Sequence, residues 1–165
     1  MIDQTALFYT LAQIAGIFVG FGALIAISAQ KDETVITGEK QALTGVVMIG
    51  LFAIIGALLP VLLSAYEMPL SQVWIVAAIV MLVFDWITIW PQRHVLIDAV
   101  KRRSAWDLVF WIGLEGTVQV PLVLILLPVL SDNAFALYAT TLIASIFQAA
   151  GLLMLLVLDF EKDAD

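Results

Sequence analysis

The 165-residue sequence has no cysteine, a single histidine and few charged residues. Without cysteine the chain has no disulfide, no thiolate nucleophile and no thiolate metal site. Charged residues make up 13% of the chain and hydrophobic residues 63%, whereas a soluble domain is about a quarter charged and about half apolar. The mean hydropathy is +1.09. We therefore predict that much of the apolar surface faces lipid.

The charge balance is acidic, with a net charge of −7 at pH 7. A nucleic-acid-binding protein needs a basic face that displaces counterions, so we expect no nucleic-acid partner.

The length allows one membrane domain with short loops. No glycine-rich phosphate loop, paired-histidine metal motif or serine nucleophile elbow is present, and His94 stands alone. We therefore expect no enzymatic activity, no cofactor and no metal site.

Five apolar stretches are long enough to cross a bilayer, whose core of about 30 Å needs about 20 helical residues. The sequence thus predicts an all-α fold, a bundle of five transmembrane helices in one domain over residues 1–165. The predicted spans are residues 6–29, 46–65, 73–90, 108–130 and 134–158. Four connecting segments separate the spans: a polar loop at 31–40, a tight turn at 67–69, a basic connector, and a turn with a helix cap at 131–133. The first span is expected to be retained, because residues 1–4 lack the positive charge of a signal peptide.

The basic residues predict the orientation of these spans. With five spans and the N-terminus outside, all seven Lys and Arg residues fall on one side of the membrane. Lys and Arg concentrate in cytoplasmic loops, so we expect the N-terminus outside and the C-terminus in the cytoplasm. The expected location is a cell membrane, with a bacterial inner membrane as the specific hypothesis.

The connector at residues 92–104 has apolar residues at helical spacing opposite a basic face, which is typical of a short interfacial helix. Its basic residues are Arg93, Lys101, Arg102 and Arg103. We expect them to contact anionic lipid headgroups. We predict that they act as a topology anchor, because the preference of basic residues for the cytoplasmic side already explains their presence. The alternative is a regulatory lipid site.

Small residues recur every four positions in the first span, at Ala12, Gly16 and Gly20. This spacing lets helix backbones approach closely in lipid. Two kinds of partner fit the stripe equally well. It packs against a second copy or a partner membrane subunit, or it packs against another helix of the same bundle.

Two acids, Asp85 and Glu115, lie inside predicted spans that contain no Lys or Arg. An ionised carboxylate at the centre of a span costs roughly 3 kcal/mol or more, so such residues are functional candidates. The helical rise places Asp85 at about 8 Å, Glu115 at about 11 Å, Gln148 at about 15 Å and Gln119 at about 17 Å from the cytoplasmic boundary. Three helices are therefore expected to contribute polar groups to one layer in the inner half. Pro121 lies one turn beyond Thr117 in the same region and removes a helical hydrogen bond there.

Three roles fit these acids. In the first, they are protonated because burial disfavours the charged form. In the second, they bind a cation or proton in transit. In the third, they form structural hydrogen bonds with Gln148, Thr140 or tryptophan side chains. The first functional hypothesis is a small oligomeric channel or carrier for cations or protons, lined by Asp85, Glu115, Gln119 and Gln148. The second is a non-catalytic subunit of a larger membrane complex. An enzyme of lipid chemistry is the third and the weakest.

Overall fold

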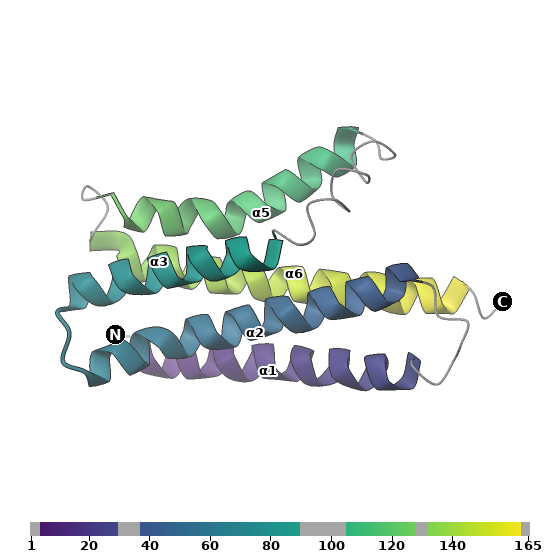
Figure 1. The fold of residues 1–165 in the computed structure, drawn as a ribbon, viewed down its shortest axis with the longest axis horizontal. Helices are drawn as coiled ribbons and strands as arrows, with labels where there is room; N and C mark the ends of the chain where they lie inside the picture. The colour runs from purple at the N-terminus through teal and green to yellow at the C-terminus, as the bar shows by residue number, and fades with distance from the viewer. Residues whose placement is uncertain (1–3, 30–36, 90–104, 128–131, 163–165) are drawn as a thin grey trace. The chain divides into compact units, whose positions relative to one another are not determined.

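The computed structural model describes residues 4–29, 37–89, 105–127 and 132–162, and within these ranges the chain is helical apart from short turns. Five helices are present there: α1 (Gln4–Ala29), α2 (Thr37–Ala65), α3 (Leu70–Ile89), α5 (Ala105–Ile125) and α6 (Ala134–Lys162) (Figure 1). A helix satisfies its backbone N–H and C=O groups internally, which is the requirement for a segment in lipid. The predicted all-α class is confirmed.

Four of these helices are long and apolar enough to cross a membrane. Their apolar segments are Gln4–Ile25, Leu43–Ala65, Leu70–Thr88 and Ala134–Met154. Within the described part of α5 the apolar segment is shorter, at Ile112–Ile125. By length and composition these helices are compatible with a multi-pass membrane protein.

The largest differences between the predicted span boundaries and the observed helix ends are at the start of α2 and at the end of α5. The loop predicted at 31–40 ends earlier than expected, since α2 begins at Thr37. The prediction followed the apolar run, whereas the helix also includes polar residues such as Glu39. The fourth span is predicted to reach residue 130, but α5 ends at Ile125. Pro128 follows closely in the sequence, and a proline disfavours helical geometry at the residue before it. Leu126 and Leu127 accordingly form i to i−3 turn bonds at 3.1 Å.

The chain forms two compact units, and α2 and α6 each contribute residues to both. Unit 1 consists of Met1–Leu58 and Ser145–Asp165. Within it α1 and α2 approach closely at two glycines, Gly22 and Gly50. A Cβ added at Gly22 would lie 3.1 Å from Cγ1 of Val46, and one added at Gly50 would collide with Val19. Close packing of α1 against α2 therefore depends on these two positions.

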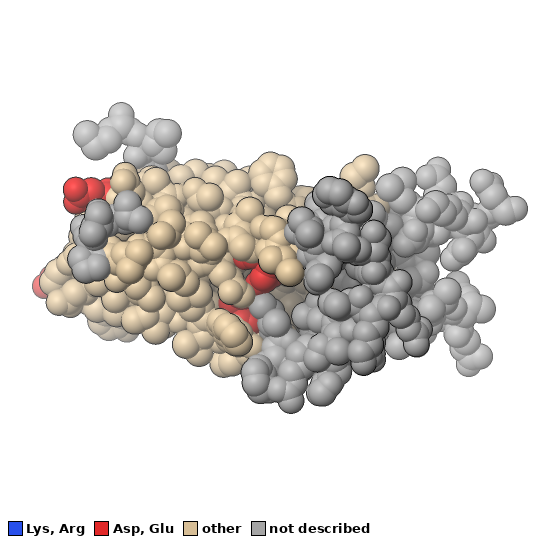
Figure 2. All heavy atoms as spheres, turned by 90° about the horizontal axis from the view of Figure 1, so that it is seen from above, with Lys and Arg blue, Asp and Glu red and all other residues tan. Residues whose placement is uncertain are grey.

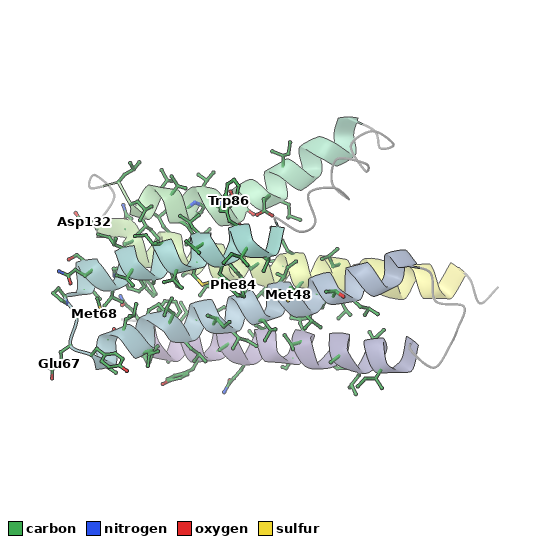
Figure 3. The ribbon with its side chains drawn as sticks, viewed as in Figure 1. Met48, Glu67, Met68, Phe84, Trp86 and Asp132 are labelled. Carbon is green, nitrogen blue, oxygen red and sulfur yellow. The ribbon has the colours of Figure 1, made fainter. Side chains whose placement is uncertain are left out.

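Unit 2 is Leu59–Ala144 and contains the end of α2, all of α3 and α5, and the start of α6. α3 packs against α5. α3 also contacts α6 through aromatic rings, since Trp74 lies 5.9 Å from Phe135 and 5.7 Å from Tyr138 between ring centroids. Glu67 in the α2–α3 turn and Asp132 before α6 lie at the same end of this unit (Figure 3).

The predicted turn at 67–69 is confirmed. Glu67 has a φ of 57°, in the left-handed region. Its N–H donates to the carbonyl of Ser64 at 3.1 Å, and the N–H of Tyr66 donates to Leu63 at 3.2 Å. These bonds satisfy carbonyls at the end of α2 and reverse the chain. The expected interfacial helix at 92–104 lies outside the described residues.

Candidate functional site

The candidate site is centred on the side-chain amide of Gln119 in α5. Its Nε2 donates to Oδ2 of Asp85 on α3 at 2.8 Å and to Oε1 of Glu115 one turn earlier at 2.9 Å. An amide NH₂ has two hydrogens, which suffice for both bonds, and ionised carboxylates only accept. The bridge therefore joins two acids from two helices. Because both are hydrogen-bond lengths from the same atom, the two carboxyl oxygens lie no more than about 6 Å apart.

The site is removed from solvent to different degrees along its length. Asp85 is buried, with 8% of its surface exposed, while Glu115 and Gln119 are half-buried. Red acidic atoms are visible in the middle of the tan surface, which is formed by residues other than Lys, Arg, Asp and Glu, as well as at its end (Figure 2). The pair of acids is thus neither sealed in the core nor fully open.

No basic side chain balances these acids in the part of the chain whose side chains are described, since every Lys and Arg lies outside it. The Gln119 amide is a neutral donor that stabilises a carboxylate without cancelling its charge. Two ionised carboxylates no more than about 6 Å apart repel by at least about 3 kcal/mol at an effective dielectric constant of about 20. A proton or a cation on the pair would remove this repulsion, which is what makes the arrangement chemically capable of exchanging one.

Near the site, the backbone of α5 lacks one helical hydrogen bond and accepts a hydrogen bond from a side chain of α6. Pro121 lies within the helix and lacks the N–H that would bond to the carbonyl of Thr117. Thr141 of α6, which has no exposed surface, donates its hydroxyl to the carbonyl of Val118 at 3.1 Å. The distance from the Thr141 hydroxyl oxygen to the carbonyl of Leu137 in the same helix is longer, at 3.4 Å.

The structure brings together three of the four residues predicted to line the ion pathway. Gln148 is buried but belongs to unit 1, whereas the other three belong to unit 2. The partner expected from α6, Thr140, is on an exposed face, and its hydroxyl donates to the carbonyl of Ala136 at 2.8 Å. The predicted headgroup-binding residues all lie outside the described residues; they are Arg93, Lys101, Arg102 and Arg103.

The small-residue stripe of α1 is not where the helices of unit 1 approach most closely. A Cβ added at Gly16 or Gly20 would meet no atom within 4 Å. Ala12 is half-buried, and the neighbouring side chains of Ile17 and Leu24 are exposed. The two glycines of the stripe thus lie beside open space in the part of the chain that the structure describes.

Sequence reasoning missed the role of Thr141. A signal for it was present, because Thr141, Ser145 and Gln148 recur at three- and four-residue steps in a largely apolar helix. All three are buried in the structure. Polar residues at this spacing in a span indicate one face that hydrogen-bonds across helices.

The described helices place the chain in the class of helical proteins whose length and composition fit a multi-pass membrane protein. Comparison with protein-family models, curated proteins and solved structures finds no match. Among the described residues, no group of three or more His, Cys, Asp or Glu side chains is arranged to hold a metal ion. The Asp85–Gln119–Glu115 bridge is therefore the feature of the described helices from which a function can be inferred.

Proposed function

We propose that this protein is a small oligomeric membrane channel or carrier for protons or other cations, and that Asp85 and Glu115 take up the ion. The observation that carries the proposal is the shared donor, because Gln119 holds two acids from different helices on one nitrogen. No Lys or Arg lies among the described side chains to neutralise them. A site with surplus negative charge inside an apolar helix pair attracts a cation or proton.

The proposal includes an orientation in the membrane. The membrane is a bacterial inner membrane, with the N-terminus outside and the C-terminus in the cytoplasm, as the basic residues predict. Arg93, Lys101, Arg102 and Arg103 then contact anionic headgroups at the cytoplasmic face. Glu67 and Asp132, which lie at one end of unit 2 (Figure 3), are at the outer face in this orientation.

The test is flux of H⁺, Na⁺ and K⁺ into liposomes that contain the purified full-length protein. The variant Glu115→Gln removes the charge and keeps the side-chain shape. Glu67→Gln is the matched control, because it makes the same chemical change in the exposed α2–α3 turn. We expect flux in the parent and in Glu67→Gln, with at least a tenfold loss in Glu115→Gln.

Each other result has a definite meaning. Equal flux in Glu115→Gln and Glu67→Gln would retain a conduction path and remove Glu115 from it. An absence of flux in the parent under an applied potential, with correctly folded protein, would contradict the channel or carrier function.

A second function, that of a non-catalytic subunit in a larger membrane complex, is favoured by the open space beside Gly16 and Gly20. In that case α1 packs against a partner helix, because small residues permit close backbone contact in lipid. Substituting Leu at both glycines should release the partner while leaving helix content unchanged. Native mass spectrometry from membranes would identify the partner as a second copy or a different subunit, and an unchanged mass in the double variant would argue against this interface.

A further inference from the structure

The stretch of α5 from Gly113 to Pro121 is intrinsically the weakest part of that helix. Gly113 and Gly116 are less favourable than alanine in a helix, and the internal Pro121 is less favourable still. An added Cβ at either glycine would meet no neighbouring atom, so close packing does not explain them. α5 bends partway along its length (Figure 1), and internal proline is a common cause of such bends.

Two hydrogen bonds join this stretch to other helices just before the proline. Thr141 of α6 donates to the carbonyl of Val118 at 3.1 Å, and Gln119 donates to Asp85 of α3 at 2.8 Å. The two attachment points are consecutive residues on α5. Losing these two bonds would weaken the attachment of this part of α5 to α6 and α3.

We propose that Pro121 is a hinge in α5 and that the hydrogen bond from Thr141 to Val118 is the latch that keeps it closed. When the latch opens and the Gln119–Asp85 bond breaks as well, the part of α5 that precedes Pro121 swings and carries Glu115 away from Asp85. Thr141 is a positioning residue, because it acts on the acids through the backbone of α5. The hinge is inferred from these contacts alone. The further inference that its movement controls ion passage rests on the proposed function.

The movement can be measured by spin-label distances in the full-length protein in lipid nanodiscs. The chain has no native cysteine, so two single cysteines can be labelled without other changes. Ile79 on α3 and Ile112 on α5 are exposed and report on the part before the hinge. Val123 is exposed on the other side of Pro121, so the pair Ile79 and Val123 is the internal control.

The test variant is Thr141→Val, which removes the donor and keeps the shape. Thr140→Val is the matched control, because the Thr140 hydroxyl donates within α6, to the carbonyl of Ala136. We expect Thr141→Val to raise the population with a long Ile79–Ile112 distance about fivefold, the factor for one net hydrogen bond. Thr140→Val should match the parent, and the Ile79–Val123 distance should stay constant in both.

Two further variants keep the proposal falsifiable if Thr141→Val folds poorly. Thr141→Ser retains the hydroxyl and should behave as the parent. Pro121→Ala restores the missing backbone N–H and should reduce the long-distance population below that of the parent. The proposal is overturned if Thr141→Val equals Thr140→Val, or if Pro121→Ala leaves the distribution unchanged. Because no transport is measured, this result is independent of whether the chain conducts ions.

Discussion

The amide nitrogen of Gln119 lies 2.8 Å from Oδ2 of Asp85 and connects α5 to α3 through a single side-chain hydrogen bond. The same nitrogen donates to Glu115 at 2.9 Å, so one neutral group serves two acids. In an apolar environment a lost donor is not replaced by water at low cost. Gln119 therefore has a structural consequence that is separate from any role in ion movement.

We predict that Gln119→Leu destabilises the protein by about 1–3 kcal/mol, because it leaves one buried and one half-buried acceptor without their donor. The measurement is unfolding in mild detergent titrated with sodium dodecyl sulfate. Gln13→Leu in α1 is the control, since Gln13 is an exposed glutamine in an apolar helix, and it should be neutral or slightly stabilising. Equal stability of the two variants would contradict the bridging role.

The glycines of unit 1 should respond in opposite ways to the same substitution. In Gly50→Ala the new methyl collides with the Val19 side chain and lies 3.5 Å from the Ala15 carbonyl oxygen. A helical valine has one strongly preferred rotamer, so α1 and α2 must separate, at a cost of about 1–3 kcal/mol. Gly16→Ala meets open space and should leave the isolated chain unchanged or up to about 1 kcal/mol more stable. The same detergent titration compares them, and a destabilised Gly16→Ala with a neutral Gly50→Ala would contradict the packing.

The helices themselves could be predicted from the sequence, because a long apolar run in lipid has only the helix available to satisfy its backbone. Their ends could not be predicted as well. An apolar run does not show where its helix begins, because α2 starts at Thr37 and includes polar residues such as Glu39 that also favour helix. The early end of α5 at Ile125 was detectable, since the effect of Pro128 on the preceding residue is local.

The candidate site was partly predictable for a related reason. Glu115 and Gln119 are four residues apart and share a helix face by spacing alone. Their contact with Asp85 depends on how α3 packs against α5, which no spacing within one helix specifies. The glycines show the same limit. Composition indicated close packing in α1, but Gly16 and Gly50 look alike in sequence, and only the fold shows that Gly50 carries the contact with α1.

The α2–α3 turn offers a stabilising substitution. Glu67 has a φ of 57°, a conformation that costs a residue with a Cβ about 1–2 kcal/mol and costs glycine almost nothing. We therefore expect Glu67→Gly to stabilise the protein by up to about 1 kcal/mol, after allowance for the greater flexibility of glycine in the unfolded chain. Glu67→Ala is the control, since it removes the carboxyl and keeps the backbone cost. A gain in Glu67→Ala equal to that in Glu67→Gly would mean that the side chain, and not the backbone, is responsible.

Two tryptophans of α3 provide a direct test of which face of that helix contacts α6. Trp74 is 6% exposed and its ring contacts Tyr138 and Phe135, whereas Trp86 is 56% exposed. Removing a buried aromatic side chain typically costs about 3–5 kcal/mol, from lost contacts and the cavity left behind. We expect a loss of this size for Trp74→Ala and less than about 1 kcal/mol for Trp86→Ala, measured by the same unfolding titration. If Trp86→Ala lowered the stability more than Trp74→Ala, the face of α3 that carries Trp86 would be the packed one. The burial of Asp85 inside unit 2 would then be contradicted as well.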